Sequence, residues 1–218
     1  MANFKYLNNK FLYLLLALLL FFIFDSLFVE AKKNYISNIV FTFTILVSLY
    51  AIIDTKKPLV FASIILGLAA LVVSWSGGVM AIDMATEVFL LSLYILFFAL
   101  ITIITLASTL KHQPVTVNTL YGAICAYLLI GLTSSFIYQL IFTLNPNAFT
   151  QMTASAIDNT HFIYYSFVTL TTLGYGDTTP TSSIAQLVSW IEAVTGQVYL
   201  TMLIAELVGS YISQRKLS

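Results

Sequence analysis

Six long apolar runs, separated by short polar segments, make up most of this chain. Each run has about 18 residues or more, and about 20 apolar residues in a helix cross a hydrocarbon core of roughly 30 Å. The pattern therefore predicts an all-α membrane protein with six transmembrane helices. They are expected at residues 11–29, 36–53, 58–75, 88–110, 119–144 and 184–212.

A shorter apolar stretch covers residues 160–171. About a dozen residues are too few to span the membrane, so we expect a re-entrant helix here. The composition agrees with a membrane protein, because 60% of the residues are apolar and only 8% are charged. The mean hydropathy of +0.96 also excludes an ordinary soluble protein.

The short stretch leads into the run Thr-Leu-Thr-Thr-Leu-Gly-Tyr-Gly-Asp at residues 169–177. Two glycines flank an aromatic residue, a threonine lies two residues before the first glycine, and an acid follows the second. This run resembles the selectivity filter of potassium channels, in which backbone carbonyls replace the hydration shell of the ion. Leu173 stands where that family usually has valine. The alternative is an ordinary Gly-Tyr-Gly-Asp surface turn.

The resemblance implies an extended filter in which K⁺ binds to backbone carbonyls and to a threonine hydroxyl. Gly174 and Gly176 suit this role because they reach backbone regions that are costly for residues with a Cβ. The ion-binding residues are expected to be Thr172, Leu173, Gly174, Tyr175 and Gly176, with K⁺ held at the first four.

Residues 119–213 resemble, as a unit, the outer helix, pore helix, filter and inner helix of tetrameric potassium channels. One copy of the filter supplies a quarter of each ion site, so the resemblance implies a homotetramer. We expect a four-helix domain at residues 1–112 and a pore domain at residues 113–218. Residues 88–110 contain no Lys or Arg, so the fourth helix lacks the charges of a voltage sensor, and voltage gating should be weak or absent.

Four residues near the filter are expected to support it. Tyr164 and Tyr165 stand where the family often has paired aromatics around the filter tyrosine, and Tyr164 would donate its phenolic hydrogen to Asp177. Val168 shares a helix face with Tyr164 and would lie behind the filter. The alternative for the tyrosines is an ordinary aromatic belt at the membrane interface.

The last apolar run carries the residues expected to gate the pore. Gly196 is nineteen residues after Asp177, where the family has a hinge glycine, although membrane glycines also serve close packing. The acid Glu206 would collect cations or bond to a neighbouring subunit. Glu192 would brace the pore helix through hydrogen bonds. A cavity lining or inner gate is expected from Leu200, Ile204 and Val208.

The basic residues predict the orientation. With both termini in the cytoplasm, the positive-inside bias is obeyed in a plasma membrane. The cytoplasmic basic residues would be Lys5, Lys10, Lys56, Lys57, Lys111, Arg215 and Lys216, and the outer ones Lys32 and Lys33. The acids expected on the outer face are Asp83, Glu87, Asp158 and Asp177. An alternative is a cleaved signal peptide ending near 29–31, which would leave five spans.

The remaining polar residues give little indication of other chemistry. No nucleophile–base pair, phosphate-binding loop or metal-ligand cluster emerges, so neither an enzyme nor a cofactor is expected, and no nucleic acid. The expected partners are K⁺, the lipid bilayer and three further copies. Cys125 is expected to be a packing residue, His112 a solvated histidine, and His161 an interfacial histidine or an external proton sensor. Asp25 should reach water near the outer interface. Alternative functions are a potassium transporter subunit and a non-conducting channel subunit.

Overall fold

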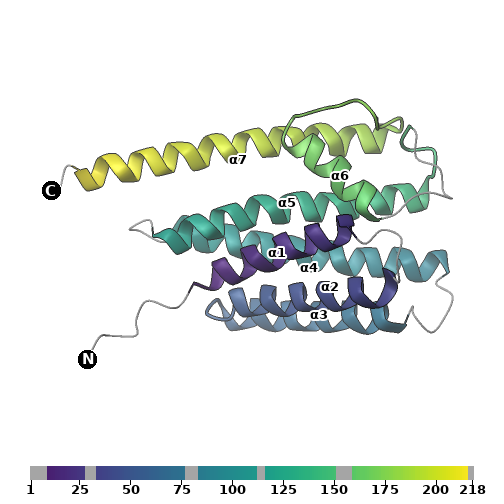
Figure 1. Cartoon of the computed structure of the whole chain (residues 1–218), viewed down its shortest axis with the longest axis horizontal. Coiled ribbons are helices and arrows are strands. Elements are labelled where there is room, and N and C mark those ends of the chain that lie inside the picture. Colours follow the sequence, from purple (N-terminus) through teal and green to yellow (C-terminus); the bar gives the residue numbers. More distant parts are fainter. Residues whose placement is uncertain (1–8, 28–32, 77–82, 112–115, 151–158, 216–218) are drawn as a thin grey trace.

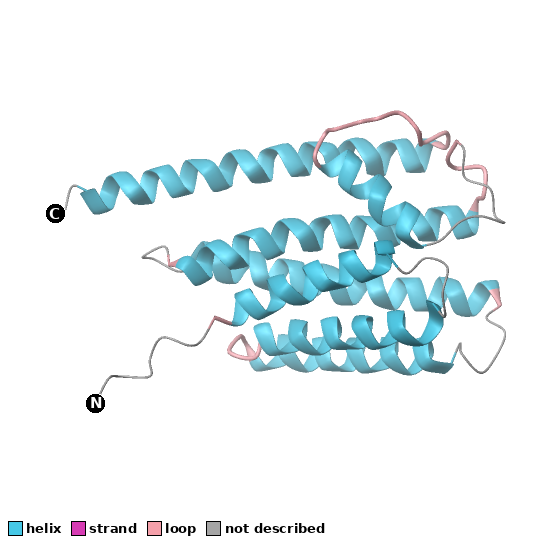
Figure 2. Cartoon of the chain, in the orientation of Figure 1, coloured by secondary structure: helices cyan, strands magenta, loops and turns pink. Residues whose placement is uncertain are grey.

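The computed structural model of the chain describes residues 9–27, 33–76, 83–111, 116–150 and 159–215. Helices account for nearly all of this described part, and its remaining segments are loops (Figure 2). The described residues form one isolated antiparallel β-bridge, between Phe149 and Pro180, and no longer strand. The helices are α1 (Lys10–Leu27), α2 (Lys33–Ala51), α3 (Lys57–Ser76), α4 (Met84–Lys111), α5 (Val117–Leu144), α6 (Asn159–Leu170) and α7 (Ser183–Arg215).

The helix ends lie close to the predicted ends of the apolar runs. Five helices within the described residues, α1, α3, α4, α5 and α7, are long and apolar enough to cross a membrane. Helix α2 has 19 residues, of which Asn38–Ala51 form a described apolar segment, and the sixth span stays a prediction. The 12 residues of α6 form the short helix expected before the filter run.

The first four helices share one hydrophobic core with α5 (Figure 1). Aromatic rings fill its centre: the ring centroids of Phe41 and Tyr94 are 4.8 Å apart, and those of Tyr94 and Phe136 are 5.1 Å apart. The most extensive helix contact in the chain joins α4 and α5. The core therefore continues across the predicted boundary at residues 112 and 113.

A second, smaller core lies where α5, α6 and α7 meet. Tyr138 of α5 packs edge-on against Tyr165 of α6, with ring centroids 4.8 Å apart. Ala185 adds the start of α7 to this core. This packing holds α6 between the two long helices, and the loop after α6 returns to α7 (Figure 2).

Asp25 does not reach water as expected. Only 7% of this residue is exposed, and the Thr160 hydroxyl donates to its carboxylate at 3.0 Å. The physical reason is that α1 packs against the first turn of α6, which supplies a polar partner inside the protein. Phe22 and Phe167 meet edge-on in the same interface, with ring centroids 5.1 Å apart. The expected exposure of Asp25 is therefore wrong.

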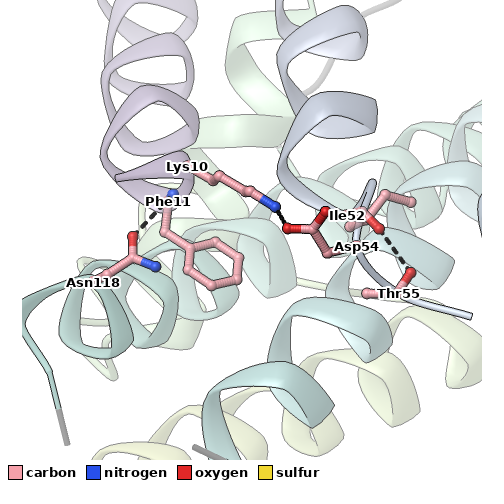
Figure 3. Close-up of polar contacts among 6 residues, drawn as sticks. All are labelled: Lys10, Phe11, Ile52, Asp54, Thr55 and Asn118. Carbon is pink, nitrogen blue, oxygen red and sulfur yellow. Dashed lines mark hydrogen bonds and ion pairs between the residues drawn. The ribbon is translucent and has the colours of Figure 1, made fainter. Parts of the chain in front are cut away.

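The opposite end of α1 is tied to α5 (Figure 3). The Phe11 backbone amide donates to Asn118 Oδ1 at 3.4 Å, and the buried Cys125 thiol donates to the Phe11 carbonyl at 3.3 Å. Gly122 allows this approach, because a Cβ there would collide with the Phe11 ring and with Thr109. The packing role expected for Cys125 is confirmed.

Candidate functional site

The backbone of the filter run alternates in handedness. Thr172 has φ 58°, Gly174 has φ 60° and Gly176 has φ 77°. Among the described residues, Thr172 is the only non-glycine with a positive φ. Alternation between the right- and left-handed regions turns successive peptide groups the same way, whereas an ordinary strand points successive carbonyls in opposite directions. This alternation is the backbone pattern expected for a column of carbonyl groups.

The amides of this run bond to the end of α6. The Leu173 and Gly174 amides donate to the Val168 carbonyl at 3.0 and 3.3 Å, and the Thr172 amide donates to the Thr169 carbonyl at 2.9 Å. These N–H groups are therefore satisfied by the end of α6. Val168 is buried, and it supports the run through its backbone carbonyl.

Tyr164 lies beside the outer part of the run. Its hydroxyl donates to Asp177 Oδ2 at 2.7 Å, which is the hydrogen bond expected from the sequence. Its ring stacks on Tyr175, with centroids 6.4 Å apart and planes 7° apart. Tyr165 lies elsewhere within the chain: it is buried against Tyr138, and its hydroxyl pairs with Ser189 Oγ at 2.7 Å. One tyrosine of the expected pair therefore meets Tyr175 in this chain.

Glu192 of α7 links this helix to α5 and α6. It is 3% exposed, and its carboxylate accepts from the Ser166 hydroxyl of α6 at 2.5 Å and from the Tyr138 hydroxyl of α5. Ser166 Oγ also lies 2.7 Å from the Gly131 carbonyl. The expectation that Glu192 braces the short helix is confirmed. Its partners Ser166 and Tyr138 were not predicted, because only the tertiary fold brings them together.

Gln197 is a residue of the site that the sequence analysis missed. Its side-chain amide donates to the Thr172 hydroxyl at 3.0 Å, so α7 directly contacts the first of the expected ion-binding residues. The available signal was an amide side chain next to Gly196 in a helix long enough to span the membrane. That signal alone does not identify the partner.

Gly196 packs closely against the end of α6. A Cβ at this position would overlap the Leu170 backbone carbonyl oxygen. Such a contact is the close-packing alternative for this glycine, and the hinge role stays a prediction. Helix α7 is continuous through this position.

The residues expected to line a cavity lie further along α7. Leu200 and Ile204 are exposed in the single chain, Glu206 is half-buried, and the side chain of Val208 lies outside the described residues. His161 is exposed at the start of α6. Of the acids predicted on the outer face, Asp83 precedes α4, and Glu87 in its first turn accepts from Thr143 of α5 at 3.2 Å. His112 and Asp158 lie outside the described residues.

Comparison with known families supports an ion channel. Residues 122–213 match the model of a family described as "Ion channel". The match covers less than half of the chain, and it includes α6, the filter run and most of α5 and α7. This part of the chain is therefore similar to an ion-channel domain, and the described helices include several that are apolar enough to cross a membrane. No curated protein and no solved structure matches the chain.

Proposed function

We propose that the chain is a potassium-selective channel subunit that passes K⁺ down its electrochemical gradient. The observation that carries the proposal is the alternating backbone of residues 172–176 in a Thr-Leu-Gly-Tyr-Gly run. Carbonyl and hydroxyl oxygens replace the hydration shell of K⁺ without the strong charge of a carboxylate. The proposed K⁺ ligands are the carbonyls of Thr172, Leu173, Gly174 and Tyr175 and the Thr172 hydroxyl.

The proposed assembly is a homotetramer. One chain supplies only one wall of a pore, and in the single chain Leu173 and Tyr175 are exposed. Helix α7 is the least buried of the candidate spans, and it exposes large apolar side chains such as Trp190 and Met202. Four copies around one axis would cover the filter and α7 together. Cross-linking or native mass measurement tests the assembly, and a conducting monomer or dimer would refute it.

The proposed membrane is the plasma membrane, with six spans and both termini in the cytoplasm. The basic residues support this orientation, since Lys10, Lys56 and Lys57 lie at the end of the helix bundle where α1 and α3 begin. The proposed peripheral unit, residues 1–112, surrounds the pore unit, residues 113–218. The variants Ser76→Cys and Thr55→Cys test the orientation, with a membrane-impermeant thiol reagent added outside intact cells. Only the cysteine at position 76 should react.

Reconstitution into lipid bilayers under K⁺ and Na⁺ gradients tests the function. Unitary currents that reverse near the K⁺ equilibrium potential support a potassium channel. Slow, saturable flux would instead support the transporter alternative, and absence of flux would support a non-conducting subunit. No observation in the structure favours either alternative.

We expect the open probability to change only shallowly with voltage. Helix α4 carries no basic residue before Lys111, and moving one charge across the field contributes about 2.3 kcal/mol per 100 mV. Steep gating needs several such charges. Steady-state open probability in symmetric K⁺ measures the slope, and a slope equivalent to about three or more charges per channel would contradict the expectation.

Selectivity should not depend on external pH between about 5 and 9. The hydrogen bond from Tyr164 holds the pKa of Asp177 below its ordinary value and raises the pKa of Tyr164 to about 12. The bond is therefore lost only as pH falls through the lowered pKa of Asp177 or rises through that of Tyr164. K⁺/Na⁺ reversal potentials at several external pH values measure this. A change in the reversal potential with its midpoint inside this pH range would contradict the expectation and favour the proton-sensing alternative for His161.

Replacing Gln197 with leucine should weaken K⁺ binding at the innermost filter site. Leucine keeps similar bulk but removes the donor that holds the Thr172 hydroxyl. One hydrogen bond contributes roughly 0.5–1.5 kcal/mol, so K⁺ affinity should fall by about two- to tenfold. Calorimetric titration of the purified channel with K⁺ measures it. Gln186→Leu is the matched control, because that amide donates to Pro180 instead, and equal losses in both variants would count against the role of Gln197.

A further inference from the structure

Helix α3 forms the edge of the chain farthest from α7 (Figure 1). Within the described residues it packs against α2 and α4 and makes no contact with α5, α6 or α7. It exposes apolar side chains along its length, including Phe61 at 66% and Val72 at 70%. In a pore built around α7, this helix is the most peripheral, so its outer face meets lipid rather than another subunit.

A groove marks the beginning of α3. Its volume is about 510 Å³, within the roughly 300–1,000 Å³ typical of sites for small ligands. Most of its lining is apolar, and one charged side chain lies at its edge. The lining residues are Ile53, Lys57, Pro58, Val60, Phe61 and Ile64.

The charge beside the groove is positive. Lys56 and Lys57 are both exposed in the turn that begins α3. Asp54, the acid nearest to them in the sequence, is paired with Lys10 of α1, and Thr55 closes the same turn by donating to the Ile52 carbonyl at 2.7 Å (Figure 3). Because Lys10 neutralises Asp54, two lysines remain to face an anion at the membrane surface.

We propose that this groove binds one anionic phospholipid. An acyl chain would lie against Phe61 and Ile64, and the phosphate would bind Lys56 and Lys57. Basic side chains at the cytoplasmic surface attract anionic headgroups, and long lysine side chains reach the interface from an apolar wall. A free phosphate would not use the apolar lining, and a second copy would have to approach the edge opposite α7. A phospholipid has an apolar chain that fits the lining and an anionic headgroup that fits the two lysines.

Lipid binding to the purified channel tests the headgroup half. Native mass measurement is made with phosphatidylglycerol and with phosphatidylcholine of the same acyl chains. Phosphatidylglycerol should bind more tightly, and each lysine should contribute about fivefold. The double variant Lys56→Gln/Lys57→Gln should therefore lose about 25-fold in affinity for phosphatidylglycerol. Lys111→Gln is the matched control, because Lys111 ends α4 and is not part of the turn that begins α3.

A second pair of variants tests the apolar half. Ile64→Trp places a large ring in the groove, whereas Ile65→Trp adds the same ring on an exposed face outside its lining. Only Ile64→Trp should reduce phosphatidylglycerol binding. Equal effects of the two variants, equal affinities for the two lipids, or unchanged binding by the double lysine variant would each overturn the proposal. These measurements need no current, so they are decided independently of whether the pore selects K⁺.

Discussion

Replacing Gly174 with alanine is expected to abolish potassium selectivity while the assembled protein stays intact. Nothing lies within 4 Å of a Cβ at this position in the chain, but the backbone has φ 60°. The left-handed backbone region costs an L-residue about 1–2 kcal/mol, and a tetramer would contain four such residues. We therefore expect the Leu173–Gly174 or Gly174–Tyr175 peptide to rotate and remove a carbonyl from the proposed ion column. Reversal potentials under K⁺ and Na⁺ gradients measure the loss.

Leu173→Val is the control for this experiment. It changes the neighbouring side chain to the residue usual in the family, and it keeps the glycine at position 174, where φ is positive. This variant should keep its K⁺ preference. Normal K⁺/Na⁺ reversal potentials in Gly174→Ala would refute the proposed filter, provided that native mass measurement shows the same assembly for both variants.

Replacing Gly196 with alanine is expected to destabilise the contact between α6 and α7. The added Cβ would overlap the Leu170 carbonyl oxygen, and this backbone atom cannot move without shifting the end of α6. Overpacking of this kind costs about 1–3 kcal/mol. The shift should also separate Gln197 from Thr172. Thermal unfolding of the purified channel, together with K⁺ affinity, measures both effects.

Gly209→Ala on the same helix is the matched control. Nothing lies within 4 Å of a Cβ there, so alanine should be neutral or should stabilise the helix by up to about 1 kcal/mol. If Gly196→Ala kept the unfolding temperature and changed only the open probability, Gly196 would be a hinge and the packing role would be wrong.

The long helices could be predicted because the thickness of a bilayer fixes the length of an apolar run. The run at residues 58–75 became α3, which begins at Lys57 and ends at Ser76. The short length of α6 followed from the same argument. The run at residues 36–53 became α2, which has 19 residues between Lys33 and Ala51.

The filter run was predictable only where glycine signals its conformation. Gly174 and Gly176 indicate a backbone with positive φ, and the structure has it at both positions. Thr172 also adopts positive φ, although threonine disfavours that region. The bonds from Thr172 to Thr169 and from Gln197 to Thr172 hold it there, and a linear pattern does not reveal such contacts. The buried position of Asp25 was missed for the same reason, because its partner Thr160 is 135 residues away.

The core shared by α4 and α5 has a consequence for biosynthesis. Neighbouring helices bury their rings against each other within one polypeptide, and contacts between segments close in sequence form quickly. The peripheral bundle can therefore fold on α5 before α7 has left the ribosome. What remains for assembly is the exposed surface of α7 and the filter loop. If the proposed tetramer forms, subunit recognition would depend on α7 and the filter loop, which are synthesised after the bundle.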